Sequence, residues 1–339
     1  MTGAGAPGAP GILHCLKQDP GLKITLADAD PNAVGAHLHE RFALIPSAGD
    51  PGFLDTLLSL CEKEKIDLVL PLVTKELFLL AGAKESFAKK GIRILVSEAG
   101  AINIANDKSA CYRFLKQKDI PVPDFRVAHN VESFVHAAFE LGHPHTPFCF
   151  KPSVSNGSRG VRLVFDSLDE SEQLFCEKPY NLSMSYAHAL HILSSKPFPE
   201  LLVSEYLSGV EYSVDCLANH GKALLVIPRS RDKMINGISV RGRFTEDSGI
   251  IEYCSRIIEA VGLHGNIGIQ VKRSATGQPL LLEINPRVQG TIVAALGAGV
   301  NLPLLAARQE MGFPPEPSAM KVNWAVGFTR YWTEVYYPC

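Results

Sequence analysis

The sequence predicts a mixed α/β protein, in which an N-terminal α/β region with a parallel sheet precedes a larger α+β region with antiparallel sheets. Up to about residue 100, short β-branched runs alternate with longer periodic segments, which is typical of βαβ units. After Asp124 the strands become longer and alternate more regularly between apolar and polar residues. The chain of 339 residues is also long for one core, because domains hold roughly 100–200 residues. We therefore expect two or three domains.

The N-terminal region contains three expected strands and two expected helices. The strands are Lys23–Ala27, Asp67–Leu72 and Arg93–Val96. Between them, Phe53–Lys63 and Thr74–Lys89 have apolar residues at intervals of three and four, which is the spacing of helices packed on a sheet.

The α+β region opens with an expected helix from Asn106 to about Lys118, and Asn106 or Asp107 is placed to cap its free amides. Longer strands follow at Phe148–Pro152, Leu201–Tyr206, Glu211–Ala218 and Leu280–Asn285. The last segment, Ala319–Cys339, holds both tryptophans and has the composition of a final strand, but the sequence indicates no role for it.

Composition excludes several classes of protein. The net charge of −2 provides no positive field toward nucleic acid or an anionic membrane. The most apolar stretch, Ile292–Ala307, is interrupted by glycines and is shorter than the ~20 residues of a membrane span. The start of the chain lacks a secretory signal, and the eight cysteines include no Cys-x-x-Cys pair. We expect a cytoplasmic protein with free thiols, no nucleic-acid partner and no membrane partner.

The first motif that indicates chemistry is Phe150–Val161, a strand, a loop of small residues and another strand. Such a loop exposes backbone amides to an anion, and Lys151 at the strand end adds a positive charge for phosphate oxygens. The motif taken alone is equally consistent with an ordinary hairpin turn and a surface lysine.

The second motif is Leu280–Arg287, which follows the strand Ile267–Lys272. Glu283 and Asn285 are two residues apart on a strand, so their side chains share one face, and Gln270 on the neighbouring strand adds a third oxygen. Oxygen ligands of this kind suit Mg²⁺. A polar strand face turned to solvent is the alternative, and the Asn-Pro-Arg ending of an apolar run argues against it.

The third motif is Leu202–Asp215, where a strand ends at a short linker. The linker backbone can pair with an adenine edge, and Glu211 can accept hydrogen bonds from two ribose hydroxyls. This signal is weak by itself, because acidic residues at strand ends are usually solvated caps or ion-pair partners.

In this order, and separated by about fifty to eighty residues, the three motifs resemble the ATP-grasp superfamily, particularly its carbamoyl-phosphate-synthetase-like branch. The resemblance runs from Asn106 to Gly312. It implies a Rossmann-like pre-ATP-grasp domain at residues 1–105 and an ATP-grasp module of two subdomains, with the phosphate-covering loop in residues 106–205 and the metal site in residues 206–318. Residues 319–339 remain a C-terminal segment without an assigned role.

The resemblance also implies the residues of the site. ATP phosphates would contact Lys108 and Lys151 and be covered by a loop that includes Ser153, Asn156, Gly157, Ser158 and Gly160. Adenine and ribose would contact Glu205, Tyr206, Leu207 and Glu211. The metal ligands would be Gln270, Glu283 and Asn285, binding Mg²⁺ with Mn²⁺ as the alternative ion. The catalytic residues would be Lys151 and Arg287, and Arg287 would stabilise the charge of the transferred phosphoryl group.

The activity that this resemblance implies is ligation driven by ATP. A carboxylate is phosphorylated to an acyl phosphate, an amine or ammonia attacks it, and ADP and phosphate are released. Besides Arg287, the arginines Arg229, Arg231 and Arg241 are candidates to bind an acidic acceptor, because guanidinium groups bind carboxylates and phosphates in a bidentate way. Each of them is equally well explained as part of a solvated basic rim. A homodimer is the default expectation.

Two alternatives remain open from the sequence. Gly3-Ala4-Gly5-Ala6-Pro7-Gly8 matches Gly-x-Gly-x-x-Gly and is followed by Asp28 and Asp30, which is the spacing of a dinucleotide site in an NAD(P)-dependent oxidoreductase. The strand that normally precedes such a loop is missing or very short here. A non-catalytic nucleotide-binding regulator is the other alternative, although it would have no need of the metal ligands.

Overall fold

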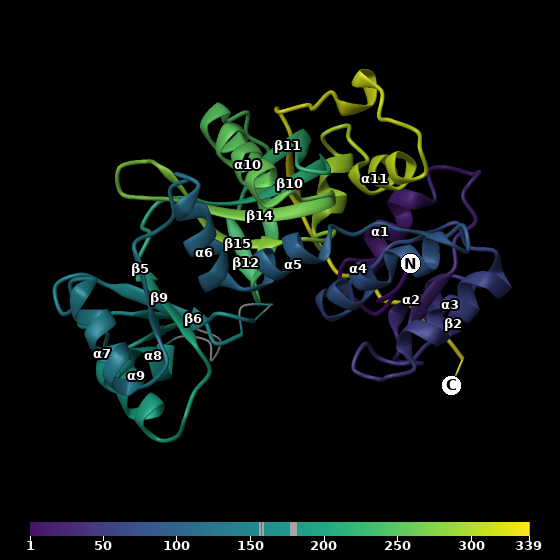
Figure 1. The fold of residues 1–339 in the computed structure, drawn as a ribbon. Helices are drawn as coiled ribbons and strands as arrows, with labels where there is room; N and C mark the ends of the chain where they lie inside the picture. Colours follow the sequence, from purple (N-terminus) through teal and green to yellow (C-terminus); the bar gives the residue numbers. More distant parts are fainter. Residues whose placement is uncertain (156, 158, 177–181, 339) are drawn as a thin grey trace. The chain divides into compact units, whose positions relative to one another are not determined.

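The computed structural model describes residues 1–155, 157, 159–176 and 182–338, and Figure 1 labels its elements. The chain divides into two units. Unit 1 consists of Met1–Ala105, Glu211–Val271 and Leu282–Cys339, and unit 2 consists of Asn106–Val210 and Lys272–Leu281. Unit 1 contains the predicted metal ligands together with the N-terminal region, whereas unit 2 contains the loop predicted to cover the phosphates.

The N-terminal part of unit 1 is built from short parallel strands and helices. Its elements are α1 Ala9–Leu16, β1 Leu26–Asp28, α2 Val34–Leu38, β2 Phe42–Leu44, α3 Phe53–Glu64, β3 Leu68–Val69, α4 Thr74–Ala88, β4 Arg93–Ile94 and α5 Ala99–Asn106. β1 pairs with β2 and β3 with β4, both in parallel. Thr2 forms parallel bridges to Ala27 and to Pro71, and therefore lies between the two strand pairs.

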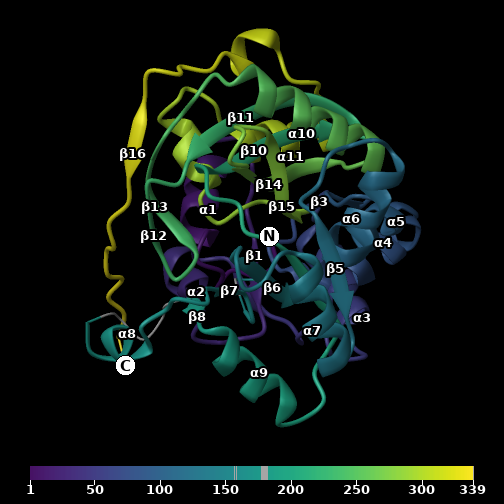
Figure 2. The same cartoon turned by 90° about the vertical axis from the view of Figure 1, so that its left-hand side faces the viewer.

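The rest of unit 1 contains the two larger sheets. Its elements are β10 Glu211–Asn219, β11 Lys222–Ser230, β12 Lys233–Ile235, β13 Ile238–Arg243, α10 Ser248–Val261, β14 Gly265–Arg273, β15 Pro279–Asn285, η1 Ile292–Leu296, α11 Leu302–Glu310, η2 Pro317–Met320 and β16 Gly327–Thr329. One sheet has the order β11-β10-β14-β15 and the other the order β12-β13-β16. Figure 2 shows β16 beside β13, with which it pairs antiparallel. The C-terminal segment thus contributes the final strand that its composition predicts.

Helix α10 shows how local sequence defines an element of this unit. Asp247 caps its N-terminus by accepting a hydrogen bond from the backbone N–H of Ile250, and Gly262 ends it with φ 75°. Its apolar residues recur at helical spacing and are buried, among them Ile250, Cys254 and Ile258. The helix packs against β11 and covers that side of the sheet.

Unit 2 is an antiparallel sheet with helices. Its elements are α6 Lys108–Gln117, β5 Phe125–Ala128, α7 Val131–Glu140, β6 Phe148–Pro152, β7 Arg162–Val164, α8 Glu170–Cys176, β8 Ser183–Met184, α9 Tyr186–Ser194 and β9 Leu201–Glu205. The strand order is β5-β9-β6-β7-β8, and among these pairs only β7 with β8 is parallel in the described residues. Helices α7 and α9 lie together against the sheet (Figure 1) and bury Phe134 with Phe148 and Phe150.

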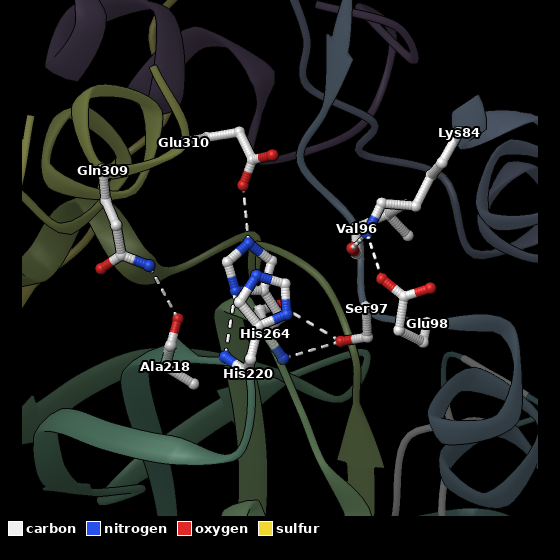
Figure 3. Close-up of polar contacts among 9 residues, drawn as sticks. All are labelled: Lys84, Val96, Ser97, Glu98, Ala218, His220, His264, Gln309 and Glu310. Atoms are coloured by element: carbon white, nitrogen blue, oxygen red, sulfur yellow. Dashed lines mark hydrogen bonds and ion pairs between the residues drawn. The ribbon is translucent and has the colours of Figure 1, made fainter. Parts of the chain in front are cut away.

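A buried polar network joins three segments of unit 1 (Figure 3). The Nδ1 atom of His264 accepts a hydrogen bond from the backbone N–H of His220 at 3.2 Å, and its Nε2 lies 2.6 Å from a carboxylate oxygen of Glu310 on α11. The backbone N–H of His264 donates to Ser97 Oγ at 2.9 Å. Burial raises the pKa of Glu310, but the hydrogen bond from His264 and the charges of His264, Lys84 and His220 together outweigh this effect, so the pKa is lowered overall. The network connects the N-terminal strands to α11 and to the β10–β11 turn.

The predicted fold class is confirmed, with parallel strands in the N-terminal region and antiparallel sheets after it. Both predicted N-terminal helices are present to within two residues at their ends. The N-terminal strands are shorter than predicted, with β3 reduced to Leu68–Val69. Among the described residues, no helix combines the length and the apolar character needed to cross a bilayer.

Candidate functional site

Two lysines of unit 2 occupy buried positions near the loop after β6. Lys108 begins α6, and its Nζ donates to the carbonyl of Ser155 at 2.5 Å, while its backbone N–H donates to the carbonyl of Ser153 at 2.8 Å. Lys151 lies on β6, and its Nζ lies 5.6 Å from the centre of the Tyr112 ring. Both side chains are almost fully buried. Both ammonium groups therefore lie in the interior of unit 2, where a charge is costly unless it is paired.

The loop between β6 and β7 begins with a hydrogen-bonded serine pair. Ser153 Oγ lies 2.5 Å from Ser109 Oγ on α6, and both side chains are buried. Both serines also hydrogen bond to Glu200. Burial raises the pKa of its carboxyl, but these bonds together with the charges of Arg113 and His129 outweigh that effect, so the pKa is lowered. Further along the loop, Gly157 and Gly160 have positive φ angles of 64° and 75°. Asn156 and Ser158, also predicted for this loop, lie outside the described residues.

The residues predicted to contact adenine follow β9. The Glu205 carboxylate accepts a hydrogen bond from the backbone N–H of Asp124 at 2.9 Å, so this side chain also connects β9 to the start of β5. The Tyr206 ring lies 4.9 Å from Lys272 Nζ, and Leu207 is buried. All of these residues belong to unit 2.

The predicted metal ligands lie on adjacent strands of unit 1. Gln270 is on β14, and Glu283 and Asn285 are on β15. Asn285 Nδ2 donates to Glu283 Oε1 at 3.0 Å, which confirms that these two side chains share one strand face. Within the described ranges, no three residues among His, Cys, Asp and Glu are grouped for metal binding. A metal here would therefore use one carboxylate together with amide oxygens.

Glu211 and Arg231, predicted for different ligands, form an ion pair. Arg231 Nε lies 3.0 Å from Glu211 Oε1, and the guanidinium also donates to Ser213 Oγ at 3.2 Å and to the carbonyl of Gly237 at 2.6 Å. Burial lowers the pKa of Arg231, and the carboxylates of Glu211 and Glu283 oppose this effect. Arg231 thus orients the carboxylate that was predicted to hold ribose.

Arg229 is completely buried and pairs with a carboxylate that is equally buried. Its Nε donates to Asp215 Oδ2 at 2.6 Å, and its Nη2 donates to Thr291 Oγ1. The guanidinium also lies 5.6 Å from the Phe328 ring centre. These contacts give Arg229 a place in the interior of unit 1. Its predicted contact with substrate would require one of these partners to move.

Arg241 and Arg287 have contrasting environments. Arg241 is exposed on β13, which pairs with β16. Arg287 follows the strand β15, and its Nε donates to Thr74 Oγ1 at the start of α4 at 2.9 Å. Burial lowers the pKa of Arg287, and the charge of Glu283 opposes that effect. In unit 1, Glu283 and Asn285 are therefore hydrogen bonded on β15, and Arg287 follows directly after the strand.

Comparison with known proteins gives matches in both the N-terminal region and the region after it. The family model described as "ATP-grasp in the biosynthetic pathway with Ter operon" matches residues 197–329, and the model "PylC-like, N-terminal domain" matches residues 10–95. The carbamoyl phosphate synthase large chain of Thermoanaerobacter sp. (strain X514) is 26% identical over 87% of this chain and 26% of its own length. That of a Thermus thermophilus strain is 26% identical over 78% of this chain and 25% of its own length.

Solved structures have the same fold. An N5-carboxyaminoimidazole ribonucleotide synthetase in an ADP complex has a TM-score of 0.70 at 16% identity, covering 95% of this chain and 78% of that one. A Campylobacter jejuni biotin carboxylase has a TM-score of 0.66 at 17% identity, covering 94% and 72%. Residues 197–329 match an ATP-grasp family, and the comparisons together support the predicted recognition of the ATP-grasp superfamily. Its relatives indicate the carbamoyl-phosphate-synthetase-like branch, and the chain spans about a quarter of the length of the curated relatives it matches.

The glycine motif of this ATP-grasp protein has a packing role that accounts for its spacing. A Cβ atom on Gly8 would lie 2.5 Å from the Cα of Gly290, and one on Gly3 would lie 2.4 Å from a methyl group of Val73. Neither contact is possible for a larger residue without movement. Packing therefore explains these glycines without a dinucleotide, and the comparisons favour neither the oxidoreductase nor the regulator.

Sequence reasoning missed several residues that contact the predicted site residues. Tyr112 lies four residues after Lys108 on α6, a spacing that places both on one helix face, and this was the available signal. Ser109, Glu200 and Thr74 carried no signal, because their roles depend on contacts between segments far apart in the sequence.

Proposed function

We propose that this ATP-grasp protein uses Mg-ATP to convert a carboxylate into an acyl phosphate and transfers the acyl group to an amine or ammonia, releasing ADP and phosphate. The observation that carries this proposal is the group Glu283, Asn285 and Arg287, in which an oxygen donor pair and a buried guanidinium follow one another along β15 and the residues directly after it.

The chemical problem is one of charge. Phosphorylating a carboxylate brings two anions together, so the catalyst must supply positive charge where negative charge develops. Lys108 and Lys151 supply two buried cations in unit 2, and Arg287 supplies another in unit 1. No nucleophilic side chain is then needed, because the substrate carboxylate attacks the γ-phosphorus.

The residues present fit a magnesium ion. Asn285 donates through its Nδ2 to Glu283, so its side-chain oxygen is not used in that bond, and Gln270 offers another amide oxygen on the adjacent strand. Mg²⁺ prefers oxygen ligands and completes its shell with water and phosphate oxygens. When bound, the ion would offset phosphate charge, and Mn²⁺ accepts the same donors.

The acceptor substrate can be proposed as a chemical class and not as a single compound. A relative in fold is named as an L-amino acid ligase, at 17% identity, and others are named as a carboxylase and a synthetase. Arg241 is exposed and Arg287 follows the metal ligands, so either is available to an acidic acceptor. We propose that the acceptor is a small carboxylate or bicarbonate.

An isotope experiment tests the proposed chemistry directly. The protein is incubated with Mg-ATP and pools of carboxylic acids labelled with ¹⁸O in the carboxyl group, each with and without amines. An acyl phosphate intermediate leaves one carboxyl oxygen in the released phosphate, so we expect ¹⁸O in phosphate only with the true acceptor. Glu283→Gln should reduce phosphate release on the order of 100-fold or more while leaving the fold intact. ADP formation with an acceptor but without label in phosphate would contradict the mechanism.

A further inference from the structure

Strand β16 adds a third arginine to a face of unit 1 that already contains two. Arg229 on β11 forms an antiparallel bridge to Phe244, which directly follows β13. β13 in turn lies beside β16 (Figure 2), and Gly242 is opposite Phe328. Directly opposed residues, and residues two apart along an extended chain, share one face. This arginine face includes Arg229, Arg231, Phe328 and Arg330.

Side-chain contacts confirm this arrangement. The Phe328 ring centre lies 5.6 Å from the guanidinium carbon of Arg229. The ring also lies close to Gly242, where a Cβ atom would be 3.0 Å from it. Exposure alternates in the same way, since Phe328 and Arg330 are half-buried and Thr329 between them is exposed. Arg330 therefore lies on the same side as the interior arginines and remains partly open to solvent.

Two arginines of this face are balanced by carboxylates of the fold, and the third is not. Arg229 pairs with Asp215, and Arg231 pairs with Glu211. In the described part of the chain, Arg330 forms no ion pair and no side-chain hydrogen bond. Burial lowers the pKa of Arg330, and the positive charge of Arg229 lowers it further. This half-buried cation is thus influenced by another cation, with no carboxylate of the described residues to balance it.

The arginine face adjoins the strands that contain the predicted metal ligands. Glu211, the partner of Arg231, is on β10, and β10 lies beside β14 in the order of its sheet. The charge of Glu283 also acts on Arg231. Arg241, considered above for the acceptor, is opposite Thr329 and therefore belongs to the other face of β13. The arginine that β16 contributes thus shares a face with Arg231, whereas Arg241 does not.

We propose that Arg330 binds an anionic group of the acceptor substrate, a carboxylate or phosphate separate from the carboxylate that becomes phosphorylated. This inference rests on the proposed ligase reaction, and it narrows the acceptor from a small carboxylate or bicarbonate to a compound with two acidic groups. A guanidinium donates two parallel hydrogen bonds to either group, and the anion balances the charge that the fold leaves uncompensated. Arg229 is completely buried against Phe328, so it contributes positive potential and makes no direct contact. The function of β16 is then to hold Arg330.

Chemical modification of the full chain tests the site without turnover. Phenylglyoxal reacts with guanidinium groups, and peptide mapping by mass spectrometry gives the rate at each arginine. Compared with sodium chloride of equal ionic strength, sodium phosphate or sodium acetate should slow the reaction of Arg330 about fivefold in a saturable way. The more effective anion shows whether the bound group is a phosphate or a carboxylate. Arg243 is the internal control, because it is exposed on the other face of β13, and its rate should be the same in all three salts. Equal protection of both arginines, or of neither, would overturn the proposal.

Steady-state kinetics connect the site to the reaction once the ¹⁸O experiment has identified an acceptor. Arg330→Gln should raise the KM for that acceptor about tenfold and leave the KM for Mg-ATP within about twofold. Arg330→Lys should recover part of the loss, because it keeps the charge and lacks the planar fork. Arg243→Gln, the matched control, should change neither constant.

The outcomes separate this inference from the proposed function. An acceptor with a single carboxylate, or an unchanged KM in Arg330→Gln, would overturn the inference while the ligase reaction stands. Protection of Arg330 by anions without transfer of ¹⁸O from any acid would mean that the site binds an anion, that the proposed reaction is wrong, and that the assignment of the anion to an acceptor fails with it.

Discussion

Two glycine-rich segments of the molecule share a composition and differ in what surrounds them. In the first, Gly3 and Gly8 face atoms at 2.4–2.5 Å from the position of a Cβ, and the atoms opposite Gly8 are backbone. In the second, a Cβ on Gly157 would meet only the end of the flexible Arg159 side chain, at 3.3 Å. The first segment is closed by packing. In the second, the space beside Gly157 is open, whereas a Cβ on Gly160 would lie 2.7 Å from the ring of Pro152.

This difference shows what a glycine pattern leaves undecided. Glycine is used where another backbone approaches closely and also where a ligand does, and the sequence pattern is the same in both cases. The occupant of the space above the glycine distinguishes them. For Gly8 the occupant is Gly290 of the same unit, whereas the space beside Gly157 contains no backbone within 4 Å among the described residues.

The largest effect on ATP turnover should come from the second segment, which is the loop after β6. Lys151→Met removes a buried cation on the strand that leads into this loop, and we expect ATP turnover to fall by about 10²–10³-fold because the charge that offsets phosphate is lost. Phosphate release measures the effect. Lys116→Met, on the exposed side of α6, is the matched control and should keep at least half of the activity. Similar losses in both variants would show that Lys151 has no special role.

A substitution beside the first segment should change the free energy of unfolding. Glu76 is buried and hydrogen bonds to Thr2, the residue before Gly3; burial, and to a lesser extent Asp28, raise its pKa from 4.5 to about 7. The protonated form is therefore favoured in the fold, and its contribution is present below pH 4.5 and is lost as the pH rises through 7. Glu76→Gln mimics the protonated form. At pH 8.5 it should unfold at a higher free energy than the unmodified chain, by up to about 3 kcal/mol.

Denaturant unfolding at pH 5 and pH 8.5 measures this prediction. The two proteins should be nearly equally stable at pH 5, where Glu76 is protonated in both the folded chain and part of the unfolded ensemble. A variant that is less stable than the unmodified protein at pH 8.5 would mean that the ionised carboxylate is well solvated in the fold.

A methyl group added to the closed segment should cost stability and leave turnover unchanged. Gly8→Ala places a Cβ 2.5 Å from the Cα of Gly290, and relieving this contact should cost about 1–3 kcal/mol of unfolding free energy. Denaturant titration measures the loss, and the activity per folded molecule should stay within twofold. An Ala variant as stable as the unmodified chain would show that the close approach is not required.

The smallest change in stability should come from a glycine that neither packs closely against backbone nor lies in the loop after β6. Gly82 lies inside α4, and a Cβ there meets no atom within 4 Å among the described residues. Gly82→Ala should stabilise the chain by about 0.5–1 kcal/mol, because glycine loses more conformational freedom in a helix than alanine. Thermal unfolding of both variants measures this prediction. The melting temperature should rise for Gly82→Ala and fall for Gly8→Ala.

Helices and central strands could be predicted from the sequence, whereas short strands could not. The predicted helix Thr74–Lys89 is observed as Thr74–Ala88, since its apolar spacing and length are strong signals. The predicted strand Asp67–Leu72 shrinks to Leu68–Val69, because pairing on one of its sides is limited to the Thr2 bridge. Strand length depends on a partner, and the sequence of one strand does not contain that partner.

The same reasoning applies to the site. The side-by-side placement of Glu283 and Asn285 follows from the two-residue period of a strand, so the sequence could predict it. The pairing of Arg231 with Glu211 could not be predicted, since it depends on the register of β10 with β11 and on the chain that follows. Periodicity therefore predicts which side chains share a face of one strand. Contacts between different strands become visible only in the structure.

The interior pair of Asp215 and Arg229 limits how this region can change over evolutionary time. Each charge is withdrawn from water and is tolerable only beside the other, so losing one alone leaves an isolated ion at a cost of about 3–5 kcal/mol. Replacing both by apolar residues of similar size avoids that cost. Descendant sequences should therefore keep this pair or abandon it in a single coupled step, and the two positions should rarely be seen half-changed.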